Sequence, residues 1–164
     1  MHTVNHTQPS VKITRYLADE AATSALGAQL GQALTPGLVI YLSGNLGAGK
    51  TSLVRAVLRG LGYTGKVKSP TFTLVELYVI SNLTLYHFDL YRFNDPSEWV
   101  DAGFRDYFGT DAVCMVEWPE KATGMLPQAD IHITLHIQDS GRSAEIEADT
   151  ETGRLCLMQL QETG

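Results

Sequence analysis

The pattern of apolar and polar residues along the chain predicts strands of two kinds. Residues 38–42 and 112–116 are continuous apolar runs, which are typical of strands buried on both faces of a sheet. Residues 11–16, 131–137 and 142–149 alternate apolar with polar side chains, which predicts strands with one exposed face. Because a short glycine-containing turn separates the last two strands, they are expected to form a hairpin.

A second hairpin is predicted for residues 72–80 and 83–91, which two polar residues join. Its second strand places His87, Asp89 and Tyr91 on one face, because side chains alternate along a strand. Three polar side chains on one face indicate a site. A solvated face of an edge strand, or a histidine packed in the core, would give the same pattern.

Helices are predicted where apolar residues recur every three or four positions. Asp19 is a candidate N-cap for a helix through residues 22–34, which a Pro-Gly pair ends. A second amphipathic helix covers residues 53–61 and stops at a glycine. Residues 95–98 provide a cap, a proline and an acid in the order that begins a short helix, and this helix carries Trp99.

The composition is that of one compact domain of 164 residues. Lys and Arg number 12 against 18 Asp and Glu, so the charge of −6 offers no broad basic surface, and any contact with nucleic acid is expected to be indirect. No apolar run approaches the roughly 20 residues of a membrane span. Residues 1–10 lack the basic and apolar regions of a secretory signal, so a cytoplasmic location is expected.

The two ends of the chain look loose. Residues 1–10 are predicted to be a flexible leader, and residues 11–164 a single domain whose pattern fades after about residue 150. Cys114 and Cys156 are far apart and fit no metal-binding spacing. They are predicted to be buried, reduced thiols with a structural role.

The clearest motif is the segment Gly44-Asn45-Leu46-Gly47-Ala48-Gly49-Lys50-Thr51, a full match to the phosphate-binding loop G-x-x-x-x-G-K-[ST]. It follows a buried strand and opens an amphipathic helix, as the motif requires. Its glycines let backbone N–H groups face phosphate oxygens at the start of the helix. Lys50 is expected to neutralise phosphates, and the Thr51 hydroxyl to ligate Mg²⁺.

This motif and the strand pattern predict an α/β, P-loop NTPase-like three-layer fold. Its central sheet is expected to be mostly parallel, with added antiparallel hairpins. The predicted ligand is a nucleoside triphosphate. The loop positions assigned to it are Gly44, Gly47, Ala48, Gly49, Lys50, Thr51 and Ser52.

A cation at the phosphates needs a carboxylate at the end of a neighbouring strand. Glu117 directly follows the apolar run 112–116, and Asp89 is the other candidate. Glu117 can equally be an acid that starts a loop. Between the phosphate-loop helix and the next strand, residues 68–73 occupy the place of a segment that senses the γ-phosphate, and Thr71 is its natural hydroxyl.

Other residues could contact a nucleotide without being decisive. Trp118 could stack on a base, face a partner or pack in the core. Arg92, Arg105 and Arg142 could contact phosphate or only solvate the surface.

Missing elements narrow the class of protein. The chain has no Asn-Lys-x-Asp element for reading guanine, and its Asp-x-x-Gly match at 106–109 does not follow an apolar strand, which argues against a GTPase. Little length remains for the lid or acceptor pocket of a small-molecule kinase.

Four segments together resemble the TsaE (YjeE) family, small P-loop ATPases of bacterial tRNA threonylcarbamoyladenosine biosynthesis. The resemblance covers about residues 16–142, and residues 44–51, 68–76, 87–92 and 116–119 carry it. The phosphate-binding loop is shared by many families, whereas the other three segments in this order are specific to this one.

The resemblance implies an ATP- and Mg²⁺-dependent ATPase that is weak alone. It implies two partner proteins, TsaD and TsaB, which transfer threonylcarbamoyl to adenosine 37 of tRNA. ATP turnover by this family is expected to drive or reset the complex of these partners. It also implies that tRNA is met through the complex. An ATP-gated adaptor with incidental hydrolysis, and a small kinase, are the alternative functions.

The resemblance also implies roles for single residues. Thr51 and Glu117 ligate Mg²⁺, Asp89 assists at the metal or orients water, and Thr71 becomes a switch hydroxyl. Weaker matches place Glu20 and Arg142 along the nucleotide. The resemblance also favours a functional role for Trp118 over packing alone, and this role is with ATP or with a partner.

Overall fold

The computed structural model describes residues 11–109 and 111–163, so the expected leader 1–10 lies outside the described residues. One sheet has the strand order β1-β7-β6-β2-β5-β4-β3. Its strands are β1 (Val11–Leu17), β2 (Val39–Ser43), β3 (Val75–Ile80), β4 (Leu83–Asp89), β5 (Val113–Glu117), β6 (Ile131–Gln138) and β7 (Gly141–Ala148). The helices are α1 (Glu20–Ala33), α2 (Lys50–Gly60), α3 (Ser97–Asp101) and α4 (Glu151–Thr163), with the 3-10 turns η1 (Phe104–Tyr107) and η2 (Pro119–Ala122).

The sheet is parallel in its centre and antiparallel at both edges. Strands β6, β2, β5 and β4 pair in parallel, while β1 with β7, β7 with β6, and β3 with β4 pair antiparallel. Both predicted hairpins are confirmed. Because the four central strands share one direction, their carboxyl ends meet at one edge, where α/β proteins place their ligands.

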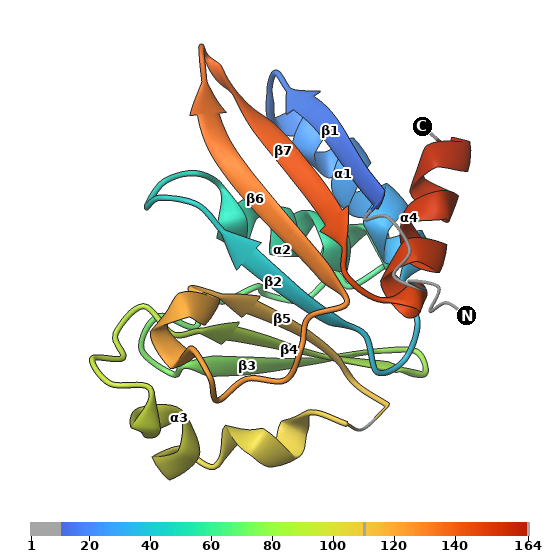
Figure 1. The fold of residues 1–164 in the computed structure, drawn as a ribbon. Helices are drawn as coiled ribbons and strands as arrows, with labels where there is room; N and C mark the ends of the chain where they lie inside the picture. The colour runs from blue at the N-terminus through green and yellow to red at the C-terminus, as the bar shows by residue number, and fades with distance from the viewer. Residues whose placement is uncertain (1–10, 110, 164) are drawn as a thin grey trace, which may run out of the picture.

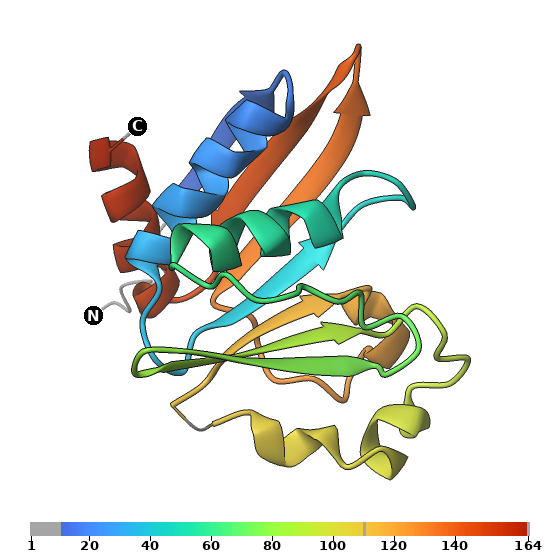
Figure 2. The same ribbon diagram turned by 180° about the vertical axis from the view of Figure 1, so that it is seen from behind.

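Helices α1, α2 and α4 cover one face of the sheet, whereas α3 and η1 lie on the other side, against the half that β3, β4 and β5 form (Figure 1, Figure 2). Two apolar clusters match this arrangement. Met115 of β5 packs with the α1 and α2 side, and its neighbours Cys114 and Val116 pack with Trp99 and Phe104. The predicted three-layer α/β fold is confirmed, and β5 is buried along its whole length.

The predicted helix starts are confirmed in detail. Asp19 caps α1, because its Oδ1 accepts from the backbone N–H of Ala22 at 2.9 Å. At α3, Asp95 Oδ1 accepts from the N–H of Ser97 at 2.8 Å, and Glu98 Oε2 accepts from the N–H of Asp95 at 2.9 Å. Asp95 and Glu98 thus both bond backbone N–H groups at the start of α3, although the helix itself begins at Ser97 with Pro96 as its N-cap.

Two predictions from the sequence are wrong: where the strand of residues 72–80 begins, and that the chain is loose after residue 150. The strand expected from residue 72 begins at Val75, because Leu74 adopts a φ of 72° and its N–H donates to the carbonyl of Pro70 at 2.7 Å, which makes a turn. The segment after residue 150 is not loose, since it forms α4. Leu157 and Leu160 on α4 are fully buried, and their helical spacing is the signal that sequence reasoning passed over.

Both cysteines are free and buried, as predicted. Burial raises the pKa of Cys114 to about 12 and that of Cys156 to about 11, so both are unreactive thiols.

None of the helices among the described residues has the length and apolar character needed to cross a membrane.

Asp130 fastens the start of β2 to the start of α4. Its carboxylate accepts from the N–H of Val39 at 2.8 Å and from the hydroxyl of Thr150 at 2.6 Å. We expect Asp130→Ala to lower the free energy of unfolding by about 1 to 3 kcal/mol, because two donors lose their acceptor. Urea unfolding measures the change. Exposed Asp101→Ala is the matched control, and equal stability of the two variants would contradict the role of Asp130.

Candidate functional site: a phosphate-binding loop and two adjoining clefts

The phosphate-binding loop connects the carboxyl end of β2 to the start of α2. Gly44, Gly47 and Gly49 have φ values of 145°, 80° and 102°, which favour glycine strongly. A Cβ on Gly44 would also come within 2.6 Å of the Leu135 carbonyl oxygen. The loop therefore adopts the glycine-dependent turns that its motif predicts, and α2 begins directly after it.

Two adjoining clefts open at this loop. A cleft of about 420 Å³ holds most of the predicted phosphate and metal residues. One of about 630 Å³ lies between the start of α1, the length of α2 and the β6–β7 turn. The first is lined by Gly47, Ala48, Gly49, Lys50, Thr51, Ser52, Thr71, Asp89, Glu117, Trp118 and Arg142, among others. The second is lined by Glu20, Ala48, Gly49, Ser52 and Arg142, among others. Gly44, although it belongs to the loop, lines neither cleft.

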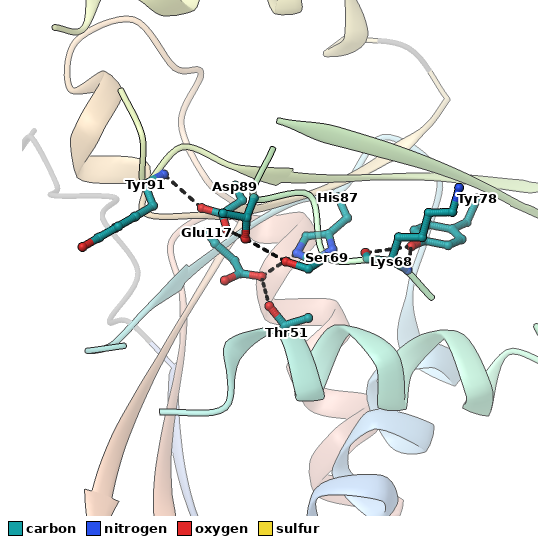
Figure 3. A network of polar contacts seen from close by, with 9 residues as sticks. Thr51, Lys68, Ser69, Tyr78, His87, Asp89, Tyr91 and Glu117 are labelled. Atoms are coloured by element: carbon teal, nitrogen blue, oxygen red, sulfur yellow. Dashed lines mark hydrogen bonds and ion pairs between the residues drawn. The ribbon is translucent and has the colours of Figure 1, made fainter. Parts of the chain in front are cut away.

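Glu117 and Thr51 meet at the floor of the smaller cleft. Glu117 is the last residue of β5, and Thr51 lies in the first turn of α2. The Thr51 hydroxyl donates to Glu117 Oε2 at 2.8 Å (Figure 3). Hydroxyl and carboxylate oxygens are the ligands that Mg²⁺ prefers. Within the described part of the chain no group of three or more His, Cys, Asp or Glu is placed to hold a metal ion by itself.

Asp89 ends β4 and stands opposite Glu117 in the parallel register. Its Oδ2 accepts from the Thr71 hydroxyl at 3.3 Å, and its Oδ1 accepts from the N–H of Tyr91 at 2.9 Å. Burial raises the pKa of Asp89, a change that the Tyr91 bond opposes and the Glu117 charge reinforces. Because β4 lies between β5 and β3, the edge-strand interpretation of its polar face is wrong.

The segment of residues 68–73 is held over this cleft at two points. At its start, the Lys68 N–H donates to the Tyr78 hydroxyl at 3.0 Å. Further on, Thr71 bonds Asp89 and also Ser69, whose hydroxyl is 2.8 Å from its own. The segment therefore brings Thr71 to the lining of the smaller cleft.

Lys50 is buried and lies against its own loop. Its ammonium donates to the carbonyls of Gly44 and Asn45, and it lies 3.9 Å from the centroid of the Trp118 ring. Trp118 has a φ of 59° and packs against Tyr91. Burial lowers the pKa of Lys50, and nearby carboxylates oppose this change. The indole thus lies at the phosphate end of the site.

Arg142 joins the β6–β7 hairpin to the phosphate-binding loop. Its Nε donates to the carbonyl of Ala48 and its Nη2 to the carbonyl of Gly47, both at 3.0 Å. The family resemblance implies a place for Arg142 along the nucleotide, but no pattern in the sequence predicts these bonds to the loop. Glu20 is the exposed first residue of α1 and faces the larger cleft. Arg92, by contrast, stacks over Phe72 and lines neither cleft.

Comparison with known proteins agrees with this geometry. Residues 17–145 match the family model of the threonylcarbamoyl adenosine biosynthesis protein TsaE. A Haemophilus influenzae protein named tRNA threonylcarbamoyladenosine biosynthesis protein TsaE is 45% identical over 147 residues, covering 87% of this chain and 93% of that protein. A Nostoc protein of the same name is 41% identical over 136 residues, covering 80% of this chain and 83% of that protein.

The fold has a close relative among solved structures. The crystal structure of Bacillus subtilis YdiB superposes with a TM-score of 0.80 at 28% sequence identity, covering 96% of this chain and 99% of that chain. The family model spans both clefts and every predicted site residue, from Glu20 to Arg142. The chain therefore belongs to the TsaE family.

Proposed function

We propose that this protein is a Mg²⁺-dependent ATPase that acts with TsaD and TsaB in tRNA threonylcarbamoyladenosine biosynthesis. The observation that carries the ATPase assignment is the hydrogen bond between Thr51 and Glu117 beside a complete phosphate-binding loop. The role in tRNA modification rests on family membership and on the printed names of the relatives. Such a role implies a cytoplasmic location.

Within this proposal the two clefts have separate tasks. The smaller cleft takes the phosphates, with Lys50 and the backbone N–H groups of the loop as donors. The larger cleft takes the nucleoside, which Glu20 and Arg142 border. Arg142 also fixes the loop carbonyls, so the loop is held in shape where the two clefts join.

Hydrolysis is an in-line attack of water on the γ-phosphorus, which depends on positioning and on neutralising charge. Mg²⁺, when bound, would supply positive charge that offsets the charge of the phosphates. Thr51 and Glu117 would hold it, and Lys50 would neutralise the remaining charge. Thr71 and Asp89 share a hydrogen bond at the same end of the cleft, where they can orient the attacking water.

The partners are proposed to supply the transfer chemistry and the contact with tRNA. The charge of −6 gives this chain no broad basic surface for tRNA of its own. ATP turnover would then drive or reset the assembly of TsaD and TsaB between cycles.

Phosphate release from Mg-ATP tests this function. We expect slow release by the chain alone and a large rise when TsaD, TsaB and tRNA are added, with Lys50→Ala as the background. Nucleotide binding without any rise would favour an ATP-gated adaptor. Transfer of the γ-phosphate to a small acceptor would favour a kinase.

A further inference from the structure

His87 is a buried titratable residue to which the proposed mechanism gives no task. It lies on β4 two residues before Asp89, and its side chain is completely buried. Its Nε2 is 2.6 Å from Glu117 Oε2, on the strand next to it (Figure 3). The imidazole therefore contacts the carboxylate directly at the proposed metal position.

The two donors to Glu117 leave one of its oxygens for a cation. The hydroxyl of Thr51 and Nε2 of His87 both bond Oε2. Among the residues that the structure describes, Oε1 has no such bond. An ionised Glu117 accepts both, which requires the hydrogen of the His87 ring to be on Nε2. Because Oε2 is held by two donors, the carboxylate cannot rotate freely about its last side-chain torsion. Oε1 is therefore held in one orientation.

A packing role alone does not account for a histidine here. Its Nδ1 is buried and has no hydrogen-bond partner within the described part of the chain, which costs stability. Leu85, two residues earlier on the same strand face, shows that an aliphatic side chain is accommodated in this layer. The contact with Glu117 is what an aliphatic residue at position 87 would lack.

We propose that His87 is a positioning residue that orients Glu117 toward the cation of the nucleotide site. The proposal rests on the Mg²⁺-dependent nucleotide binding proposed above. Partners that orient a metal ligand through hydrogen bonds typically change metal affinity by about 10- to 100-fold when they are removed. His87 contacts neither phosphate nor metal, so its effect passes through Glu117 alone.

Two substitutions separate positioning from packing. His87→Leu removes the donor, whereas His87→Gln keeps an N–H at nearly the position of Nε2. Titration of Mn²⁺ into the ADP complex, followed by electron paramagnetic resonance, gives the dissociation constant of the cation. We expect His87→Leu to raise it at least about 10-fold, and His87→Gln to stay near the unmodified protein. Leu85→Val is the matched control for a disturbed core, and it should leave the constant unchanged.

A second measurement distinguishes metal positioning from general damage. Binding of a fluorescent ADP analogue in EDTA should be the same in all these variants. An unchanged Mn²⁺ constant in His87→Leu, or an equal loss of binding in EDTA, would overturn the proposal. If His87→Leu fails to fold, His87→Asn replaces it, because its amide is too short to reach Glu117. Failure of the unmodified protein to bind Mn²⁺ in its ADP complex would instead refute the proposed function.

Discussion

Lys50→Ala is expected to weaken nucleotide binding about 100-fold, because the variant loses the ammonium that lines the smaller cleft, which we propose takes the phosphates. Truncating one partner of a buried, hydrogen-bonded charge pair costs about 2 to 5 kcal/mol, and about 2.7 kcal/mol corresponds to 100-fold. Lys50 is 5% exposed, so little solvent screens the pair that it makes with phosphate.

The ammonium is already in place for this contact. It donates to the loop carbonyls of Gly44 and Asn45, acceptors that phosphate oxygens could replace. Burial lowers the pKa of Lys50, and the added negative charge of a phosphate favours the protonated form. Binding of the nucleotide and protonation of Lys50 therefore support each other.

Calorimetric titration with ADP and Mg²⁺ measures the loss. Lys66→Ala is the matched control, since it removes an exposed lysine outside both clefts. Lys66→Ala should bind as tightly as the unmodified protein. Affinity of Lys50→Ala within a few-fold of that control would place the phosphates elsewhere.

The phosphate-binding loop and the buried apolar strands could be predicted from the sequence because each depends on neighbouring residues. The loop 44–51 requires glycine at defined backbone angles, so its conformation follows from its own residues. Glu117 and Asp89 each end a strand, and parallel strands bring their carboxyl ends together. Their approach to Thr51 then follows from the helix that the loop begins.

The contacts that were missed join segments far apart along the chain. Arg142 reaches carbonyls of the loop from a hairpin more than 90 positions later, and no local pattern records such a distance. The bond between His87 and Glu117 depends on the parallel register of β4 and β5, which apolar runs alone do not fix. The turn at Leu74 likewise depends on a distant residue, because the Leu74 carbonyl accepts a hydrogen bond from the backbone N–H of Asp89. This bond forms only in the folded sheet.

The second large effect is expected at Glu117, where Glu117→Gln should lower ATP turnover about 100-fold or more while the nucleotide still binds. Loss of a group that stabilises developing charge typically costs about 100- to 1000-fold in turnover. The amide keeps the volume of the carboxylate at a position that is 3% exposed, and its oxygen can still accept from Thr51. What it removes is the negative charge that we propose holds the cation.

Single-turnover and steady-state phosphate release in the assembly with TsaD, TsaB and tRNA measure the effect, and ADP binding in EDTA measures what is retained. Glu120→Gln is the matched control, because it makes the same change of charge near Lys50 on an exposed side chain that lines neither cleft. A general electrostatic effect would slow both variants alike. Equal rates for Glu117→Gln and the unmodified protein would show that Glu117 does not hold the catalytic cation, whereas a loss confined to Glu117→Gln assigns the charge requirement to the end of β5.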